Sequence, residues 1–342
     1  MNEPSAIFEI IHSLVNHPEG RLSVSGMCRI AGVSRSGCYA WVKAAPIREA
    51  QEEQDRKDFD IILEACQRRG YSKGARGICM RLLHMEPPVV MNIKKIRRLM
   101  DKYSLSCPIR KADPYRRIAK ALKTSNVADS LLQREFECYG PRTVLLTDIT
   151  YIPYNGTFAY LSTILDACTK QVLSYVLSGS LEVDFVLETV EKLIQDHGIS
   201  LTRRTVIHSD QGVHYTSHRF IEITKNRNLR QSMSRRGNCW DNAPQESFFG
   251  RMKDHIKDRL KGCGAFEQVS SIVDDYMDYY NKEKYQWELA KLSPDEFYGF
   301  CITGEYPLKI ESLPPVPIPE KLASELGKTK PLEENGGGKA TE

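Results

Sequence analysis

The pattern of apolar positions divides the chain into a helical first part and a mixed central part. From residue 142, three β-branched and aromatic runs follow one another, and the turn signal Asn155-Gly156 joins the first two into a hairpin. A helix, a short strand, a helix, a short strand and a helix are predicted after them. The segments are 142–155, 157–169, 171–180, 181–198, 205–210, 218–228, 230–234 and 245–260. This order predicts an α/β core with a mixed five-stranded sheet.

The residues on either side of this core have helical spacing or none. Before it we expect all-α modules, and after it one helix and a shorter helix that begins at Ser293-Pro294. The expected domains, in chain order, are a helix-turn-helix (1–45), a linker helix (46–67), a second basic helix-turn-helix-like module (68–125), a connector (126–140), the α/β core (141–265), a C-terminal helical segment (266–303) and a disordered tail (304–342).

The first module has the residues that a helix-turn-helix needs at its boundaries. Ser23 or Ser25 can cap one helix, Gly32 lies at the turn, and Ser34 can cap the next. The second helix would present three side chains to DNA, namely Arg35, Ser36 and Lys43. The alternative is a generic helical hairpin. The expected core residues are Val24, Met27, Ile30, Ala31, Val33, Tyr39 and Trp41.

Charge is distributed unevenly along the chain, although the net charge is only +4. Residues 68–123 contain 16 lysines and arginines against three acids, which gives a local charge of +13. A surface with such a high density of positive charge is suited to binding phosphates. The second helix predicted within residues 68–123 has an apolar side and, opposite to it, four basic residues that we expect to contact DNA: Lys94, Lys95, Arg97 and Arg98. The alternative is a basic helix that faces solvent.

Three acids in the core occupy unusual places. Asp148 lies inside a strand run, where aspartate is disfavoured, Asp210 lies where a strand ends, and Glu246 lies in the first turn of a helix. Carboxylate oxygens are preferred ligands of Mg²⁺, and two ions held together can stabilise both the attacking and the leaving oxygen of a phosphoryl displacement. Spacing alone is weak evidence, because the chain has 44 acids.

Other chemistries have little support in the sequence. The ten cysteines are scattered without a C-x-x-C pair, which favours reduced thiols over zinc ribbons or disulfides. No apolar run approaches the 18 residues of a membrane span, and no signal peptide is evident, so we expect a cytoplasmic protein. The histidines near Asp210 lack the G-x-S-x-G elbow of a hydrolase. His208 is a candidate to support Asp210 from behind, and Asp166 is interpreted as structural.

Longer motifs provide the context that spacing lacks. The segments TDITYI, HSDQGVHYTS and GNCWDNAPQESFFG, with 35 residues between Asp210 and Glu246, resemble the catalytic frame of bacterial insertion-sequence transposases of the insertion-sequence-three family. These enzymes belong to the DDE superfamily of retroviral integrases. The similarity runs from about residue 22 to residue 300. It implies an RNase H-like fold for the core.

The resemblance also implies an activity and its residues. Asp148, Asp210 and Glu246 would be the catalytic triad and would bind two Mg²⁺ ions, for which Mn²⁺ can substitute. The enzyme would cleave DNA at the element's ends and transfer strands through a circular intermediate (copy-out, paste-in), as a dimer or higher oligomer on double-stranded DNA. Lys253, two helical turns after Glu246, matches the family's lysine and would bind DNA. In the loop before Glu246, DNA contact is expected from Arg235, Arg236, Trp240 and Asn242, although Trp240 and Asn242 could instead anchor the loop.

One departure from the family and two alternative functions remain at this stage. Family transposases usually carry a further helix-turn-helix and a leucine zipper, and no sustained heptad repeat is present here. The chain is therefore expected to be the catalytic frame alone or a differently organised lineage. A structure-selective nuclease on the same fold, or a catalytically silent DNA-binding regulator, would also fit parts of the pattern.

Overall fold

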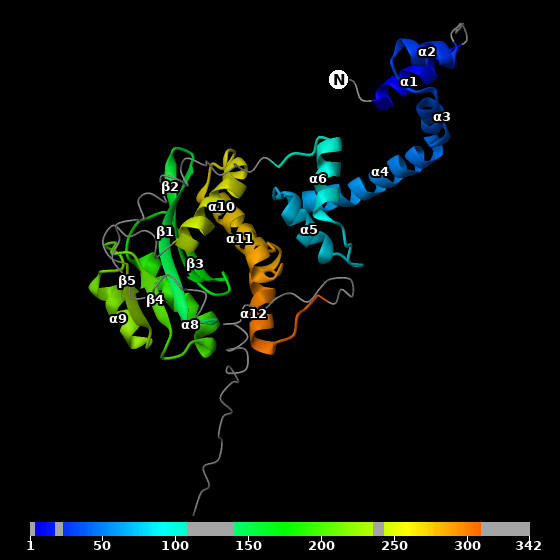
Figure 1. The fold of residues 1–342 in the computed structure, drawn as a ribbon. Coiled ribbons are helices and arrows are strands. Elements are labelled where there is room, and N and C mark those ends of the chain that lie inside the picture. Colours follow the sequence, from blue (N-terminus) through cyan, green and yellow to red (C-terminus); the bar gives the residue numbers. More distant parts are fainter. Residues whose placement is uncertain (1–3, 18–22, 108–139, 235–242, 309–342) are drawn as a thin grey trace, which may run out of the picture. The chain divides into compact units, whose positions relative to one another are not determined.

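The computed structural model describes residues 4–17, 23–107, 140–234 and 243–308 (Figure 1). It separates into two compact units. The first contains the N-terminal residues up to Glu64 together with Arg98–Ser104, and the second contains Ala65–Arg97 and the residues from Leu105 onward. No helix among the described residues is long and apolar enough to cross a membrane.

The first unit begins with three short helices, α1 (Pro4–Val15), α2 (Val24–Ile30) and α3 (Arg35–Lys43). The Ser23 hydroxyl accepts a hydrogen bond from the Gly26 amide, and the Ser34 hydroxyl accepts one from the Gly37 amide. These bonds satisfy amides that the first turn of a helix leaves without partners. Gly32 in the turn has a φ of +67°, which glycine adopts without strain. The expected caps at Ser23 and Ser34 and the turn at Gly32 are therefore confirmed.

The expected core of this module was partly wrong. Ile30 is 84% exposed and Tyr39 is 56% exposed, whereas Ile11, Cys28 and Cys38 are buried. Ile30 follows Cys28 by two residues, which is about 200° around an α-helix, so burial of one side chain exposes the other. Val24, Met27 and Val33 pack around the edge of the cluster, as expected.

The long helix α4 (Ala45–Gln67) corresponds to the expected linker helix. Its Asp55 carboxylate is buried and accepts hydrogen bonds from Arg98 Nη1 at 2.7 Å and Arg98 Nη2 at 2.6 Å, and from Lys102 Nζ at 2.8 Å. Arg98 and Lys102 lie on α6 (Ile93–Lys102). The hydrogen bonds from these two cations hold the Asp55 pKa well below its usual range, so the ion pair persists at neutral pH.

A mixed five-stranded sheet forms the centre of the second unit, with the strand order β3-β2-β1-β4-β5. The first three strands are antiparallel neighbours, and β4 and β5 run parallel to β1. The strands are β1 (Val144–Tyr154), β2 (Thr157–Asp166), β3 (Val172–Ser178), β4 (Val206–Ser209) and β5 (Arg230–Met233). Asn155 and Gly156 both have positive φ and turn β1 into β2, as the Asn-Gly pair predicts. The expected strand and helix order is confirmed.

Helices cover both faces of this sheet (Figure 1). Alternation along β1 sends Leu146 to a cluster with Phe248 and Tyr276, and sends Leu145 to a second cluster with Phe185. The helices α10 (Ala243–Leu260) and α11 (Phe266–Lys282) supply the first cluster, and α8 (Asp184–His197) and α9 (His218–Asn226) supply the second. Burial of both faces explains why β1 and β2 read as nearly continuous apolar runs.

Asp166 has a structural role, as expected from the sequence. Its side chain is fully buried at the end of β2. It accepts hydrogen bonds from the Arg142 guanidinium at 2.8 Å and from the backbone amides of Arg142 and Cys168, both at 2.9 Å. A buried carboxylate is tolerated when it is paired and hydrogen-bonded in this way. The Asp166 carboxylate therefore connects the residues before β1 to the turn after β2.

A segment before the core packs on α10 and α11 within the same unit. The Tyr71 ring, in the segment between α4 and α5 (Ala75–Leu83), stacks on Tyr279 with centroids 4.1 Å apart. The Tyr71 hydroxyl donates to Asp275 at 2.6 Å, and Asp275 also accepts from Arg69 and Arg259, each at 2.6 Å. The last helix among the described residues is α12 (Pro294–Thr303), and the Ser293 hydroxyl caps it by accepting a hydrogen bond from the Glu296 amide.

Candidate active site

The register of β1 and β4 brings two of the predicted acids to equivalent positions. These strands are parallel neighbours, and their last paired residues are Leu146 and His208. Two residues further along each strand are Asp148 and Asp210, the latter one residue beyond the end of β4. Neighbouring strands lie about 4.8 Å apart, and residues two apart share a face. Asp148 and Asp210 therefore start from adjacent backbone positions on the face that α10 covers.

Local hydrogen bonds orient both aspartates. Asp148 Oδ1 accepts from the Ile149 amide at 2.8 Å, and Asp210 Oδ1 accepts from the Gly212 amide at 2.9 Å. A Cβ at position 212 would lie only 2.8 Å from Asp210 Oδ1, which is closer than side chains tolerate. The glycine in the SDQG segment thus permits the tight turn that holds the Asp210 carboxylate.

Glu246 reaches the same face on the first turn of α10. The preceding residue, Gln245, is fully buried and donates from Nε2 to the Thr163 hydroxyl on β2. Thr163 is the cross-strand partner of Asp148, so the two side chains share a face. Gln245 thereby fixes the start of α10 beside Asp148. This role of Gln245 was not foreseen from the sequence, where its one signal was an amide side chain next to the catalytic candidate.

The electrostatics of Asp148 show that the three acids influence one another. The pKa of Asp148 is raised to about 7, mainly by burial and also by the negative charges of Asp210 and Glu246, which together outweigh the opposing hydrogen bond from the Ile149 amide. Both Asp210 and Glu246 are exposed, whereas Asp148 is half-buried. A bound cation is stabilised most by an acid that is half-buried and lies next to two other acids, because it offsets both the burial of that charge and the repulsion among the three carboxylates.

Lys253 is also part of this environment. Its side chain is half-buried, and burial lowers the pKa of its ammonium group, while the Asp148 carboxylate acts in the opposite direction. The interaction places Lys253 on the side of α10 that faces the acids. From the sequence, Lys253 was expected to lie too far from Glu246 to act at the same metal ion. Its electrostatic interaction with Asp148 was not predicted.

The three acids fit a divalent metal in chemistry, without forming a closed cage. Their six carboxylate oxygens are hard donors, and their mutual repulsion at Asp148 is what a cation would relieve. Within the described ranges, no three histidine, cysteine, aspartate or glutamate side chains lie close enough to hold an ion by themselves. Such open carboxylate sites are typical where substrate phosphate completes the coordination of Mg²⁺.

His208 lies behind this site in β4. It is buried, and its Nδ1 is 3.1 Å from the hydroxyl of Ser232, its neighbour on β5. The buried hydroxyl of Tyr215 lies 3.4 Å from the Thr147 hydroxyl on β1. These contacts stiffen the strand ends from which Asp148 and Asp210 extend.

The predicted DNA-contacting residues lie on several elements. Arg35, Ser36 and Lys43 are exposed on α3. On α6, Lys94 and Arg97 are exposed and Lys95 is half-buried, while Ile96, Leu99 and Met100 are buried beneath them. Arg98 is half-exposed and engaged with Asp55. Four predicted residues, Arg235, Arg236, Trp240 and Asn242, lie outside the described residues.

Comparison with known proteins identifies the family of this chain. Two family models described as "Integrase core domain" match residues 139–239 and 227–294. The putative transposase InsK of the insertion sequence element IS150 from Escherichia coli K12 is 31% identical over 274 residues, which cover 79% of this chain and 92% of that protein. This chain is a bacterial insertion-sequence transposase of the IS3 family. It is thus an enzyme of the DDE polynucleotidyl transferase type.

The transposase is similar to further curated proteins and to solved structures. InsF of insertion sequence IS3A, also from Escherichia coli K12, is 27% identical over 82% of this chain and 95% of its own length. Among solved structures, the catalytic core domain of HTLV-2 integrase in complex with magnesium is 17% identical. It covers 46% of the transposase and 97% of its own chain, with a TM-score of 0.36.

Proposed function

We propose that this transposase cuts DNA at the ends of its insertion sequence and joins the resulting 3′-hydroxyl to a new phosphate, with Asp148, Asp210 and Glu246 as its catalytic residues. The observation that carries this proposal is the electrostatic coupling of the three acids at one end of the sheet. They come from β1, the end of β4 and α10, and two of them, Asp210 and Glu246, are exposed to solvent.

Each part of the site has a separate task in this mechanism. Asp148, Asp210 and Glu246 would hold Mg²⁺ through their carboxylate oxygens. Bound divalent ions supply charge stabilisation to both the attacking and the leaving oxygen of an in-line displacement. Gln245 and the Gly212 turn hold two of the carboxylates in place. Lys253 positions the phosphates next to the scissile one as a point charge.

DNA binding is assigned to the basic helices. On α3, Arg35, Ser36 and Lys43 are exposed together, and on α6 the cations project from a helix whose opposite side is buried. Lysines and arginines arranged in this way contact backbone phosphates and fix the position of the duplex. Four residues of the loop before Glu246 are also proposed to contact the cleaved strand, namely Arg235, Arg236, Trp240 and Asn242.

The wider reaction is the one that the resemblance to the family implies. A transposase that cuts one end and uses its 3′-hydroxyl near the other end produces a circular intermediate, which is later integrated in the copy-out, paste-in pathway. Both ends must then be held together, so we expect at least a dimer on double-stranded DNA.

A strand-transfer assay with duplexes that carry the element's ends tests the proposal. Asp148→Asn, Asp210→Asn and Glu246→Gln should each abolish cleavage and joining in Mg²⁺ while DNA affinity is retained. Glu267→Gln is the matched control, because Glu267 is an exposed acid in the first turn of a different helix, α11. Cut products without joined products would indicate a nuclease. Binding without any cutting would indicate a regulator.

A further inference from the structure

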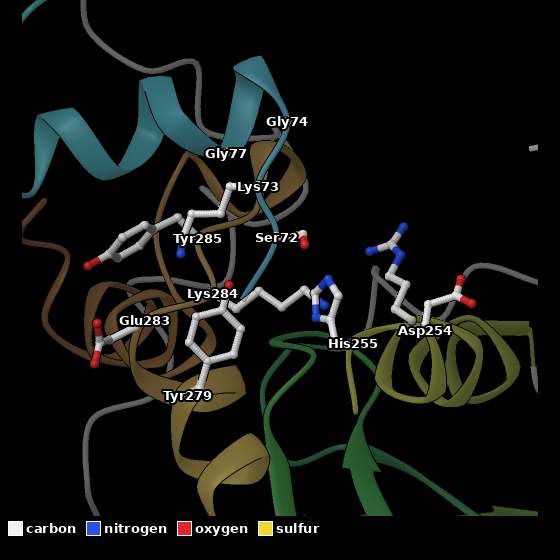
Figure 2. Close-up of a pocket in the computed structure, with 11 residues that line it drawn as sticks. Ser72, Lys73, Gly74, Gly77, Asp254, His255, Tyr279, Glu283, Lys284 and Tyr285 are labelled. Atoms are coloured by element: carbon white, nitrogen blue, oxygen red, sulfur yellow. The ribbon is translucent and has the colours of Figure 1, made fainter. Parts of the chain in front are cut away.

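A cavity of about 250 Å³ lies on another side of α10, within the second unit (Figure 2). The segment that begins α5 forms one wall, α10 forms a second, and the end of α11 with the residues after it forms the third. The volume holds several waters, each of which occupies about 30 Å³. His255 of α10 follows Glu246 by nine residues, or about 13 Å and two and a half turns, so it projects from the opposite side of the helix.

Basic side chains dominate the lining of this cavity. Lys73, Arg251, His255 and Lys284 all face it. Two acids are also present. Glu283 accepts hydrogen bonds from Arg68 and Arg69, both at 3.1 Å, so its charge is already offset. Figure 2 shows the Asp254 carboxylate directed away from Lys284. The lining of the cavity therefore has more basic than acidic side chains.

The pKa values of these groups reflect the crowding of like charges in a place with little water. The pKa of Lys284 is lowered to about 7, mainly by burial and also by the charge of Arg251. Burial lowers the pKa of His255 to about 3, with the charges of Lys284, Lys73 and Arg251 as additional causes. Burial likewise lowers the pKa of Lys73 to about 8. An anion in the cavity would stabilise the charged form of each group.

Several hydrogen-bond donors remain available to such an anion. Lys284 donates to the Tyr276 hydroxyl at 3.1 Å, which accounts for one of its three N–H groups. His255 Nδ1 is buried and has no hydrogen-bond partner among the described residues. Gly74 and Gly77, which line the cavity, are the N-cap and a first-turn residue of α5, and no side chain caps this helix. Lys73 differs, because its ammonium group already donates to three backbone carbonyls.

We propose that this cavity binds a phosphate group of the DNA backbone, at a site separate from the catalytic carboxylates. Lys284 and Arg251 would contact the phosphate oxygens directly, and the amides at the start of α5 would contribute further donors, since helix N-termini favour anions. Lys73 would contribute charge alone. The identity of the ligand as DNA rests on the proposed function, whereas the anion chemistry follows from the cavity.

The first test uses inorganic phosphate as the probe on the full chain. Phosphate at constant ionic strength should raise the pKa of Lys284, followed by NMR of its labelled ε-carbon, and should raise the melting temperature. Lys284→Met keeps an apolar stem of similar length and should abolish the thermal shift. Lys282→Met is the matched control, because Lys282 is exposed and paired with Asp278 outside the cavity. An unchanged Lys284 pKa together with an unchanged melting temperature would overturn the proposal.

The second test asks whether the phosphate belongs to DNA. Lys284→Met and Arg251→Gln should each weaken duplex binding several-fold and lower the slope of affinity against salt by about one unit, as expected when one cation no longer neutralises a phosphate. Lys257→Gln, an exposed cation of the same helix that does not line the cavity, should change neither quantity beyond its general charge effect. Phosphate binding with an unchanged salt slope would overturn the assignment to DNA and indicate a site for free phosphate.

These readouts require neither metal nor catalysis, so they separate the two proposals. If wild-type protein fails to cut or join DNA but the salt slope responds to Lys284→Met, the catalytic proposal fails and the phosphate site stands. If Glu246→Gln abolishes joining and Lys284→Met leaves the slope unchanged, the reverse holds.

Discussion

Gln245 and Thr163 are joined by a buried hydrogen bond that ties the first turn of α10 to β2. Thr163 is paired with Asp148 across β1 and β2, and Gln245 is adjacent in sequence to Glu246. One side-chain hydrogen bond therefore links the positions of two proposed catalytic acids, Asp148 and Glu246, that are almost a hundred residues apart in the sequence. It connects the packing of α10 on the sheet with the geometry of the site.

Replacement of Gln245 should impair catalysis without removing a ligand. We expect Gln245→Leu to lower the rate of joining at saturating DNA by roughly 10- to 100-fold, because small displacements of a catalytic group are costly. DNA affinity should change little. Thr163→Val should have a similar effect, and the double variant should be no worse than either single variant, since both remove the same bond. Additive losses in single-turnover kinetics would show that the two residues act independently.

Metal affinity should depend on pH through Asp148. Because the pKa of its carboxyl group is raised to about 7 in the protein without metal, the group is largely protonated below that pH. Ion binding requires the carboxylate, so the apparent affinity for Mg²⁺ or Mn²⁺ should fall about tenfold for each pH unit below 7 and level off above it. Calorimetric titrations between pH 6 and 8 measure this. The same affinity across this range would contradict the raised pKa.

Loss of Lys253 should differ from loss of Glu246. We expect Lys253→Ala to weaken binding to the element's ends and to slow joining, while cleavage persists at high DNA concentration, because a positioning charge is removed and every carboxylate remains. End-DNA affinity and single-turnover joining are the measurements. Wild-type values for both would mean that Lys253 only packs beside Asp148.

The basic residues of α6 should contribute to binding of all DNA sequences. Lys94, Lys95 and Arg97 changed together to glutamine should weaken binding and lower the salt slope by about one unit for each phosphate that is no longer neutralised. Arg98 is best left intact in this test, because it bonds to the buried Asp55 and its removal would destabilise the fold. Arg98→Gln alone should lower the urea midpoint of unfolding, and an unchanged midpoint would refute this structural role.

The sequence alone determined the features that depend on local chemistry. Alternating apolar residues, the Asn155-Gly156 turn and the serine caps define the strands, the hairpin and the short helices, because each depends on neighbours a few residues away. The three acids were also recognisable, since an aspartate inside a strand and an acid after a strand end are unusual wherever they occur. Asp166 was assigned a structural role from its apolar neighbours, and its buried bonds confirm this.

Only the tertiary structure decided which side chains meet. The Gln245–Thr163 bond joins residues 82 positions apart, and the cavity around Lys284 gathers residues from three separate segments. Ile30 and Tyr39 were wrongly expected in a core, because apolar character does not show which side of a short helix faces its neighbours. Arg98 appeared equivalent to Arg97 in sequence, yet it bonds to a buried acid on α4. Periodicity determines which residues share a face, whereas the partner of that face depends on how distant segments pack.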